Sequence, residues 1–120
     1  MQSLYPEKIP LPLAKETKEE IEQMVQQGVI SPTDEPTEWC APIVVTPKTN
    51  GKVRICVDLS ELKNFVEREN HRLPSVDHTL GNLAGSNHFS KLDANSGFWQ
   101  IKLAEESRRL TTFITLWGRY

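Results

Sequence analysis

The chain has 120 residues, with 14 basic against 16 acidic side chains and a formal net charge of −2. This length fits one small domain and excludes two, and the balanced charge excludes a strong overall attraction to polyanions, although local basic clusters still act over short distances. The sequence has no membrane-length apolar run and no secretory signal, so it predicts an intracellular protein, cytoplasmic or nuclear, without membrane contact. Cys40 and Cys56 have no zinc-type spacing with the histidines.

The first third of the chain predicts an extended segment and one helix. Three prolines within residues 5–13 favour extended backbone there. From Lys15 to Gln27 the apolar residues recur at helical spacing and Gly28 follows, which predicts an amphipathic helix with a glycine stop. Thr17 and Glu20 have the spacing of a capping box near its start.

The middle of the chain predicts a β-hairpin. Two β-branched runs, residues 43–48 and 52–59, flank Asn50-Gly51, which is a strong hairpin signal. On the second strand Val53, Ile55 and Val57 share one face. The alternating residues, Arg54, Cys56 and Asp58, share the other.

The remaining residues predict further short elements. We expect short helices over residues 59–66 and 75–83, the second capped by Ser75, and then a strand that ends at Asp93. A tight turn, a strand over residues 99–103, a polar turn over residues 105–108 and a strand over residues 110–116 complete the order. Such an order is typical of an α+β fold, with mixed or antiparallel strands and short helices. The chain stops directly after the last strand, so we expect it to be a C-terminally truncated part of something larger.

Three groups of residues are candidates for chemistry. Lys48, Lys52 and Arg54 surround the hairpin turn and suit phosphate oxygens, although basic residues at a hairpin tip also simply keep an edge soluble. Asp93, followed by small residues, suits Mg²⁺, although its spacing taken alone favours an Asx-turn. Phe98, with its neighbour Trp99, is either core or a surface on which part of a nucleotide stacks.

The chain resembles the N-terminal part of a retroelement reverse transcriptase, most like the Ty3/Gypsy class of LTR retrotransposons. Four ordered stretches carry the resemblance, which covers nearly the whole chain: EEIEQMVQQGVISPTDEPTEWCAPIVVTPKTNGKVRICVDL, RLPSVDHTLGNLAG, FSKLDANSGFWQIKL and RRLTTFITLWGRY. It implies a right-hand polymerase, in which residues 1–85 form the fingers and connecting segments and residues 86–120 the start of the palm.

The resemblance also implies roles for individual residues. Asp93 falls on the first metal-binding aspartate of the palm, Ala94 under the incoming triphosphate, and Phe98 on the aromatic gate that excludes a ribose 2′-hydroxyl. Arg54 and Lys48 fall on the fingers residues that contact the triphosphate, and Lys52 lies beside them as a nucleic-acid contact.

The resemblance further implies an RNA-directed DNA polymerase that binds a template-primer, dNTPs and Mg²⁺. The sequence contains no Asp-Asp, so the Tyr-x-Asp-Asp segment that supplies the other metal ligands in the family is missing. The expected partners include the remainder of a polyprotein, namely the rest of the palm, the thumb and an RNase H domain. We therefore expect the chain alone to be inactive. The alternative is a non-enzymatic retroelement remnant that binds nucleic acid or protein.

Overall fold

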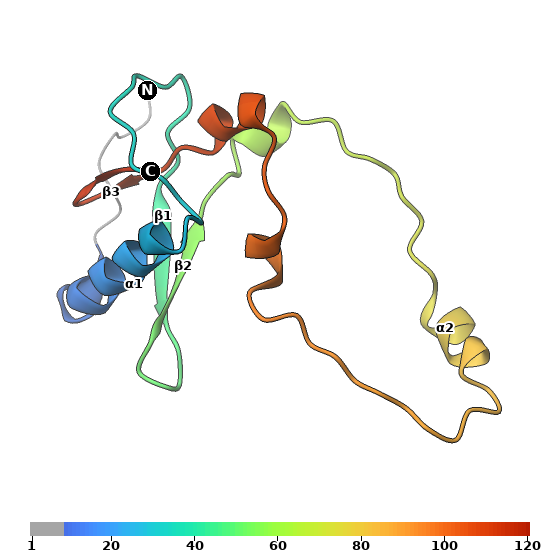
Figure 1. Ribbon diagram of the computed structural model, residues 1–120. Helices are drawn as coiled ribbons and strands as arrows, with labels where there is room; N and C mark the ends of the chain where they lie inside the picture. Colours follow the sequence, from blue (N-terminus) through green and yellow to red (C-terminus); the bar gives the residue numbers. More distant parts are fainter. Residues whose placement is uncertain (1–8) are drawn as a thin grey trace. The chain divides into compact units, whose positions relative to one another are not determined.

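The computed structural model describes residues 9–120, which divide into two compact units (Figure 1). Unit 1 comprises the described residues up to Phe65 together with Lys102–Tyr120, and unit 2 is Val66–Ile101. The expected extended segment lies partly outside the described residues. In its described part, Leu11–Leu13 forms a turn of 3-10 helix, so the expectation of extended backbone is wrong for these three residues.

Helix α1, Ala14–Gln26, confirms the helix predicted from apolar spacing. Ile21 on its apolar face is only 1% exposed, and Gly28 beyond its end adopts a φ of +70°. The expected capping box is wrong, because the helix begins before Thr17. The Thr17 hydroxyl is inside the helix and donates a hydrogen bond of 2.6 Å to the carbonyl oxygen of Leu13.

Strands β1, Ile43–Pro47, and β2, Val53–Val57, confirm the predicted hairpin. They pair antiparallel, with Thr46 opposite Arg54. One face packs inward, since Ile43 and Val53 are each 2% exposed. The predicted alternation of the two faces along the hairpin is therefore also confirmed.

The core of unit 1 joins distant parts of the sequence. Ile9, Ile43 and Phe113 form its buried centre, and Phe113 stacks on Tyr120 with ring centroids 5.9 Å apart. A second, shorter hairpin of β3, Ile114–Thr115, and β4, Gly118–Arg119, adjoins it. The strand expected over residues 110–116 is therefore confirmed only in part, and the turn expected before it is part of a 3-10 helix over Glu105–Thr111.

Unit 2 contains helix α2, Val76–Asn82. The backbone N–H of His78 donates to the Ser75 hydroxyl oxygen at 3.2 Å, which confirms the predicted cap. The strands expected before Asp93 and over residues 99–103 are wrong. Residues 86–94 form no regular element, and Gly97–Gln100 forms a 3-10 helix. Strands need pairing partners, and the described residues of unit 2 contain none.

The helix expected over residues 59–66 is reduced to a 3-10 turn at Leu62–Asn64. A segment this short gains few helical hydrogen bonds to offset the cost of nucleation. Neither this turn nor any other helix within residues 9–120 has the length and apolar character that a membrane crossing requires.

Candidate functional site

The outward face of the first hairpin gathers three cations. Thr46 lies opposite Arg54 in the register, and the backbone N–H of Lys48 donates to the carbonyl oxygen of Lys52 at 2.7 Å. Because paired residues and residues two apart share a face of a hairpin, Lys48, Lys52 and Arg54 all project from the face opposite to buried Val53. All three are exposed.

The turn between the two strands is held by its own residues. The side-chain oxygen of Asn50 accepts a hydrogen bond from the backbone N–H of Lys52 at 3.2 Å, as in an Asx-turn. Gly51 has a φ of +77°, which glycine adopts without the steric cost that a Cβ would bring. Asn50 and Gly51 therefore fix the spacing between Lys48 and strand β2.

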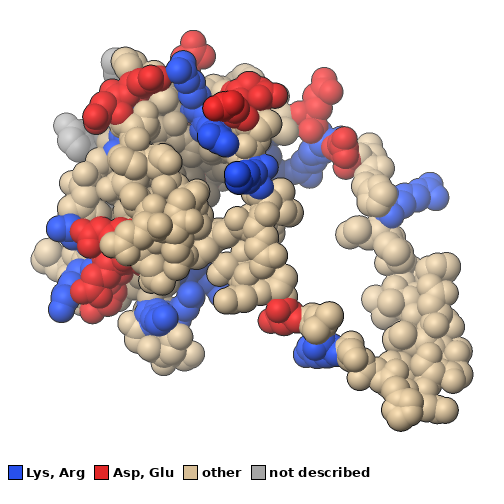
Figure 2. Space-filling model, in the orientation of Figure 1, with Lys and Arg blue, Asp and Glu red and all other residues tan. Residues whose placement is uncertain are grey.

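A hollow of about 420 Å³ adjoins this face, lined by residues 46–50 and Arg54. Its lining contains Lys48 and Arg54 and no acidic residue. Figure 2 shows blue atoms at the lower end of the hairpin, whereas red atoms gather elsewhere in unit 1. Arg offers a planar fork and Lys a compact charge to phosphate oxygens, so this hollow suits a phosphorylated ligand.

Unit 2 holds the remaining residues singled out from the sequence. Asp93 and Ala94 are exposed, and Phe98 is 94% exposed, so the alternative in which Phe98 belongs to the core is wrong for this structure. A turn at residues 95–96 follows Asp93, with Ser96 at a φ of +50°. The tight turn predicted here is thus confirmed. The side chain of Gln100 spans it by donating to the carbonyl oxygen of Asn95 at 2.8 Å.

The carboxylate of Asp93 is one possible metal ligand rather than a complete site. Within the described part of the chain, no three His, Cys, Asp or Glu side chains gather where they can hold a metal ion. Mg²⁺ prefers oxygen ligands and uses carboxylates with substrate phosphates, so Asp93 has suitable chemistry but the described residues do not fit the whole site. The hairpin cations belong to unit 1 and Asp93, Ala94 and Phe98 to unit 2.

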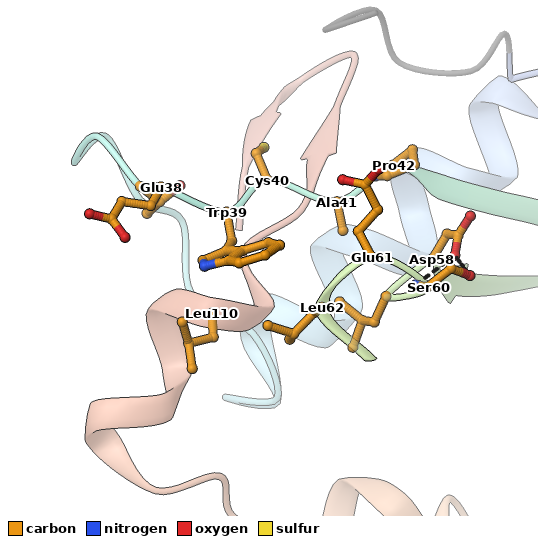
Figure 3. Close-up of a pocket in the computed structure, with 12 residues that line it drawn as sticks. Glu38, Trp39, Cys40, Ala41, Pro42, Asp58, Ser60, Glu61, Leu62 and Leu110 are labelled. Atoms are coloured by element: carbon orange, nitrogen blue, oxygen red, sulfur yellow. Dashed lines mark hydrogen bonds between the residues drawn. The ribbon is translucent and has the colours of Figure 1, made fainter. Parts of the chain in front are cut away.

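Sequence reasoning missed a second hollow in unit 1, beside Trp39 (Figure 3). Its volume is also about 420 Å³, and its lining comes from residues 37–42, residues 58–62 and Leu110. No spacing in the sequence indicates it, because three separate segments form it. At its edge, hydrogen bonds from the Ser60 hydroxyl and backbone N–H hold the pKa of Asp58 below its ordinary value.

Comparisons with known proteins agree on one family. Residues 46–119 match the family model described as reverse transcriptase (RNA-dependent DNA polymerase). The chain is 30% identical over 122 aligned residues to the retrovirus-related Pol polyprotein from transposon opus of Drosophila melanogaster, covering 98% of this chain and 12% of that protein. It is 33% identical to the enzymatic polyprotein of Cestrum yellow leaf curling virus, covering 90% of this chain and 17% of that protein.

The same similarity holds for a solved structure. The protease–reverse transcriptase of prototype foamy virus matches with a TM-score of 0.75 and 25% sequence identity, covering 95% of this chain and 16% of the foamy virus chain. The present chain therefore spans less than a fifth of the length of each of these three relatives.

Proposed function

This chain belongs to the reverse transcriptase family, and we propose that its parent protein is an RNA-directed DNA polymerase of a Ty3/Gypsy-like LTR retroelement. In this proposal residues 1–85 belong to the fingers and connecting segments of a right-hand polymerase, and residues 86–120 begin the palm. The family match over residues 46–119 and the likeness to the foamy virus chain support this assignment.

The observation that carries the proposal is the basic face of the first hairpin. Thr46 lies opposite Arg54, and the turn brings Lys48 to the same hollow as Arg54. We assign Lys48 and Arg54 to the triphosphate of the incoming dNTP, because charge-assisted hydrogen bonds to phosphate are short and strong. Lys52, on the same face, is assigned to the phosphate backbone of the template-primer.

Phe98 and Ala94 of unit 2 are also assigned to the incoming nucleotide, each from its own surroundings. The ring of Phe98 is 94% exposed, so it is available to a substrate rather than committed to packing within unit 2. A bulky ring beside the sugar excludes a 2′-hydroxyl by its size, and we assign this role to Phe98. Ala94 is exposed and carries only a methyl group, so its small side chain leaves room for phosphates.

Asp93 is assigned to the metal site of the complete polymerase. Nucleotidyl transfer uses two Mg²⁺ ions, which activate the attacking hydroxyl and stabilise the leaving group. Asp93 supplies one carboxylate, and its further partners are carboxylates outside this chain, from the rest of the polyprotein's polymerase domain. The exposed cations on one face of the hairpin favour a second candidate function for the chain by itself: binding of nucleic acid without catalysis.

Primer extension tests both parts of the proposal. The 120-residue chain, given RNA template, DNA primer, dNTPs and Mg²⁺, is expected to incorporate no nucleotide. Robust incorporation that Asp93→Ala abolishes would refute the inactivity of the chain alone. In the longer parent polypeptide, Asp93→Ala is expected to abolish extension, whereas Asp77→Ala, which removes an exposed carboxylate of α2 in the same unit, should leave it unchanged.

The gate assignment has its own test in the parent polypeptide. Phe98→Ala is expected to raise the incorporation of rNTPs relative to dNTPs, because the side chain that blocks the 2′-hydroxyl is gone. Phe89→Ala removes another exposed ring of unit 2 and serves as the matched control. Equal discrimination between the two sugars in Phe98→Ala and the unmodified protein would contradict the assignment.

A further inference from the structure

The hollow at the hairpin turn is lined by more polar groups than its two cations. Besides Lys48 and Arg54, its lining includes two hydroxyl groups and one side-chain amide, from Thr46, Thr49 and Asn50. Hydroxyl and amide groups are neutral donors of hydrogen bonds, and phosphate oxygens are strong acceptors. These neutral groups can therefore bind the same kind of ligand as the cations.

Thr46 is placed beside Arg54 by the strand register. The two residues lie directly opposite each other on β1 and β2, and side chains of opposite residues share a face, with Cβ atoms about 4.5–5.5 Å apart. Thr46 is exposed, and its hydroxyl makes no hydrogen bond to the described residues. The hydroxyl is thus free to donate to a phosphate group that Arg54 binds.

Asn50 is placed by the turn. Its side-chain oxygen accepts a hydrogen bond from the backbone N–H of Lys52 at 3.2 Å, and the backbone N–H of Gly51 donates to the carbonyl oxygen of Lys48 at 3.2 Å. Because the side-chain oxygen is engaged, the NH₂ end of the amide is the one left for a ligand in the hollow. Thr49 also lines the hollow, but neither the strand register nor a hydrogen bond fixes its side chain, so it is given no role.

The charge of the lining favours an anion with several acceptor oxygens. The lining contains no carboxylate, so no group in it repels phosphate. Lys48 comes from the end of the first strand and Arg54 from the second, and each has a neutral donor close to it in the hairpin, Asn50 and Thr46. Such an arrangement suits a chain of phosphates better than a single small anion.

We propose that Thr46 and Asn50 are further phosphate-binding residues of this hollow. The Thr46 hydroxyl donates to the phosphate group that Arg54 binds, and the NH₂ group of Asn50 donates to the one that Lys48 binds. The ligand is the triphosphate chain of the incoming nucleotide, and these contacts need neither its base nor its sugar. This inference rests on the proposed function, because it adds residues to the same triphosphate site.

Inorganic tripolyphosphate is the probe, because it presents the chain without base or sugar. Its binding to the 120-residue chain is measured by calorimetry at low salt and by the shifts of the hairpin amide signals in ¹⁵N NMR spectra. Thr46→Val keeps the β-branched shape and removes the hydroxyl, and it is expected to weaken binding about two- to fivefold. Thr46→Ser keeps the hydroxyl and should restore most of the affinity. Equal losses in the two variants would overturn the role of the Thr46 hydroxyl.

Asn50→Asp tests the amide without removing the turn. Aspartate keeps the side-chain oxygen that accepts from Lys52, and Asp-Gly is itself a favoured hairpin turn, but the NH₂ donor becomes a negative oxygen. Tripolyphosphate binding is expected to weaken about three- to tenfold. Asn64→Asp adds the same charge at an exposed residue outside the hollow and should leave the affinity unchanged. Equal losses in these two variants would show that overall charge alone is responsible, and the inference would be wrong for Asn50.

Two comparisons separate this inference from the proposals beside it. If Lys48→Ala and Arg54→Ala weaken tripolyphosphate binding but Thr46→Val and Asn50→Asp do not, this inference fails and the assignment of the two cations stands. If the two alanine variants also leave binding unchanged, the triphosphate site itself is wrong. The other source of phosphate is the backbone of the template-primer. A loss of RNA–DNA hybrid affinity in Thr46→Val that equals its loss of tripolyphosphate affinity would assign the hollow to that backbone and overturn the inference.

Discussion

Neutralising the basic face of the hairpin should remove most of the salt-dependent binding of an RNA–DNA hybrid. The change is the triple variant Lys48→Ala, Lys52→Ala and Arg54→Ala, which replaces three exposed cations on one face. Each phosphate contact contributes a slope of about −0.9 to the plot of log affinity against log salt concentration. Three contacts give a slope of about −2.7, which is a loss of roughly 40-fold in affinity between 50 and 200 mM salt.

Fluorescence anisotropy with a labelled hybrid over this salt range measures the slope directly. The triple variant should bind more weakly at low salt, and its slope should fall by about the three-contact value. The control replaces Lys15, Lys18 and Lys63 by alanine, which removes the same charge from exposed positions outside the hairpin. A similar reduction of the slope in the control and the hairpin variant would refute the reasoning, because overall charge alone would then account for binding.

Three further predictions concern the fold. Ile43 is 2% exposed, so Ile43→Ala creates a cavity and should lower the free energy of unfolding by about 2–5 kcal/mol in urea titrations. Val44→Ala, on the exposed face, should lower it by less than about 1 kcal/mol. Equal losses in the two variants would contradict the assignment of faces. Gly51→Ala should destabilise the hairpin by about 1 kcal/mol at its φ of +77°, and Gly51→Asn should cost less because asparagine tolerates this conformation. Ser60→Ala should raise the pKa of Asp58 in NMR titrations, because it removes a hydrogen bond that lowers this pKa. Since the pKa of Asp58 is lower in the folded chain, its contribution to stability is present above the unfolded pKa. That contribution is lost as the pH falls through the folded pKa.

The elements that the sequence predicted well are those whose causes are local. The hairpin follows from Asn50-Gly51 between two β-branched runs, and the turn is closed by the side chain of Asn50 itself. The start of α2 follows from Ser75, whose hydroxyl caps it within one turn. In each case the residues that determine the structure lie within a few positions of it, so one sequence is enough to identify them.

The elements that were predicted wrongly depend on distant partners. Phe89, Leu92 and Ile101 have the composition of strands but are 66%, 95% and 77% exposed, and the described residues of unit 2 offer no strand to pair with them. Strand propensity largely reflects packing against neighbouring strands rather than an intrinsic backbone preference. An apolar run therefore indicates where a strand can form, and whether the strand forms depends on a neighbouring strand with which it can pair.

The two hollows of unit 1 show the same limit at the level of function. The basic hollow comes from residues 46–54, so its cations are visible as one short stretch of sequence. The hollow beside Trp39 is lined by residues 37–42, residues 58–62 and Leu110, which are three separate segments of the sequence. No pattern in the sequence links these segments, whereas the pairing of β1 with β2 and the hydrogen bond from the Asp58 N–H to the Pro42 carbonyl oxygen bring residues 37–42 beside residues 58–62.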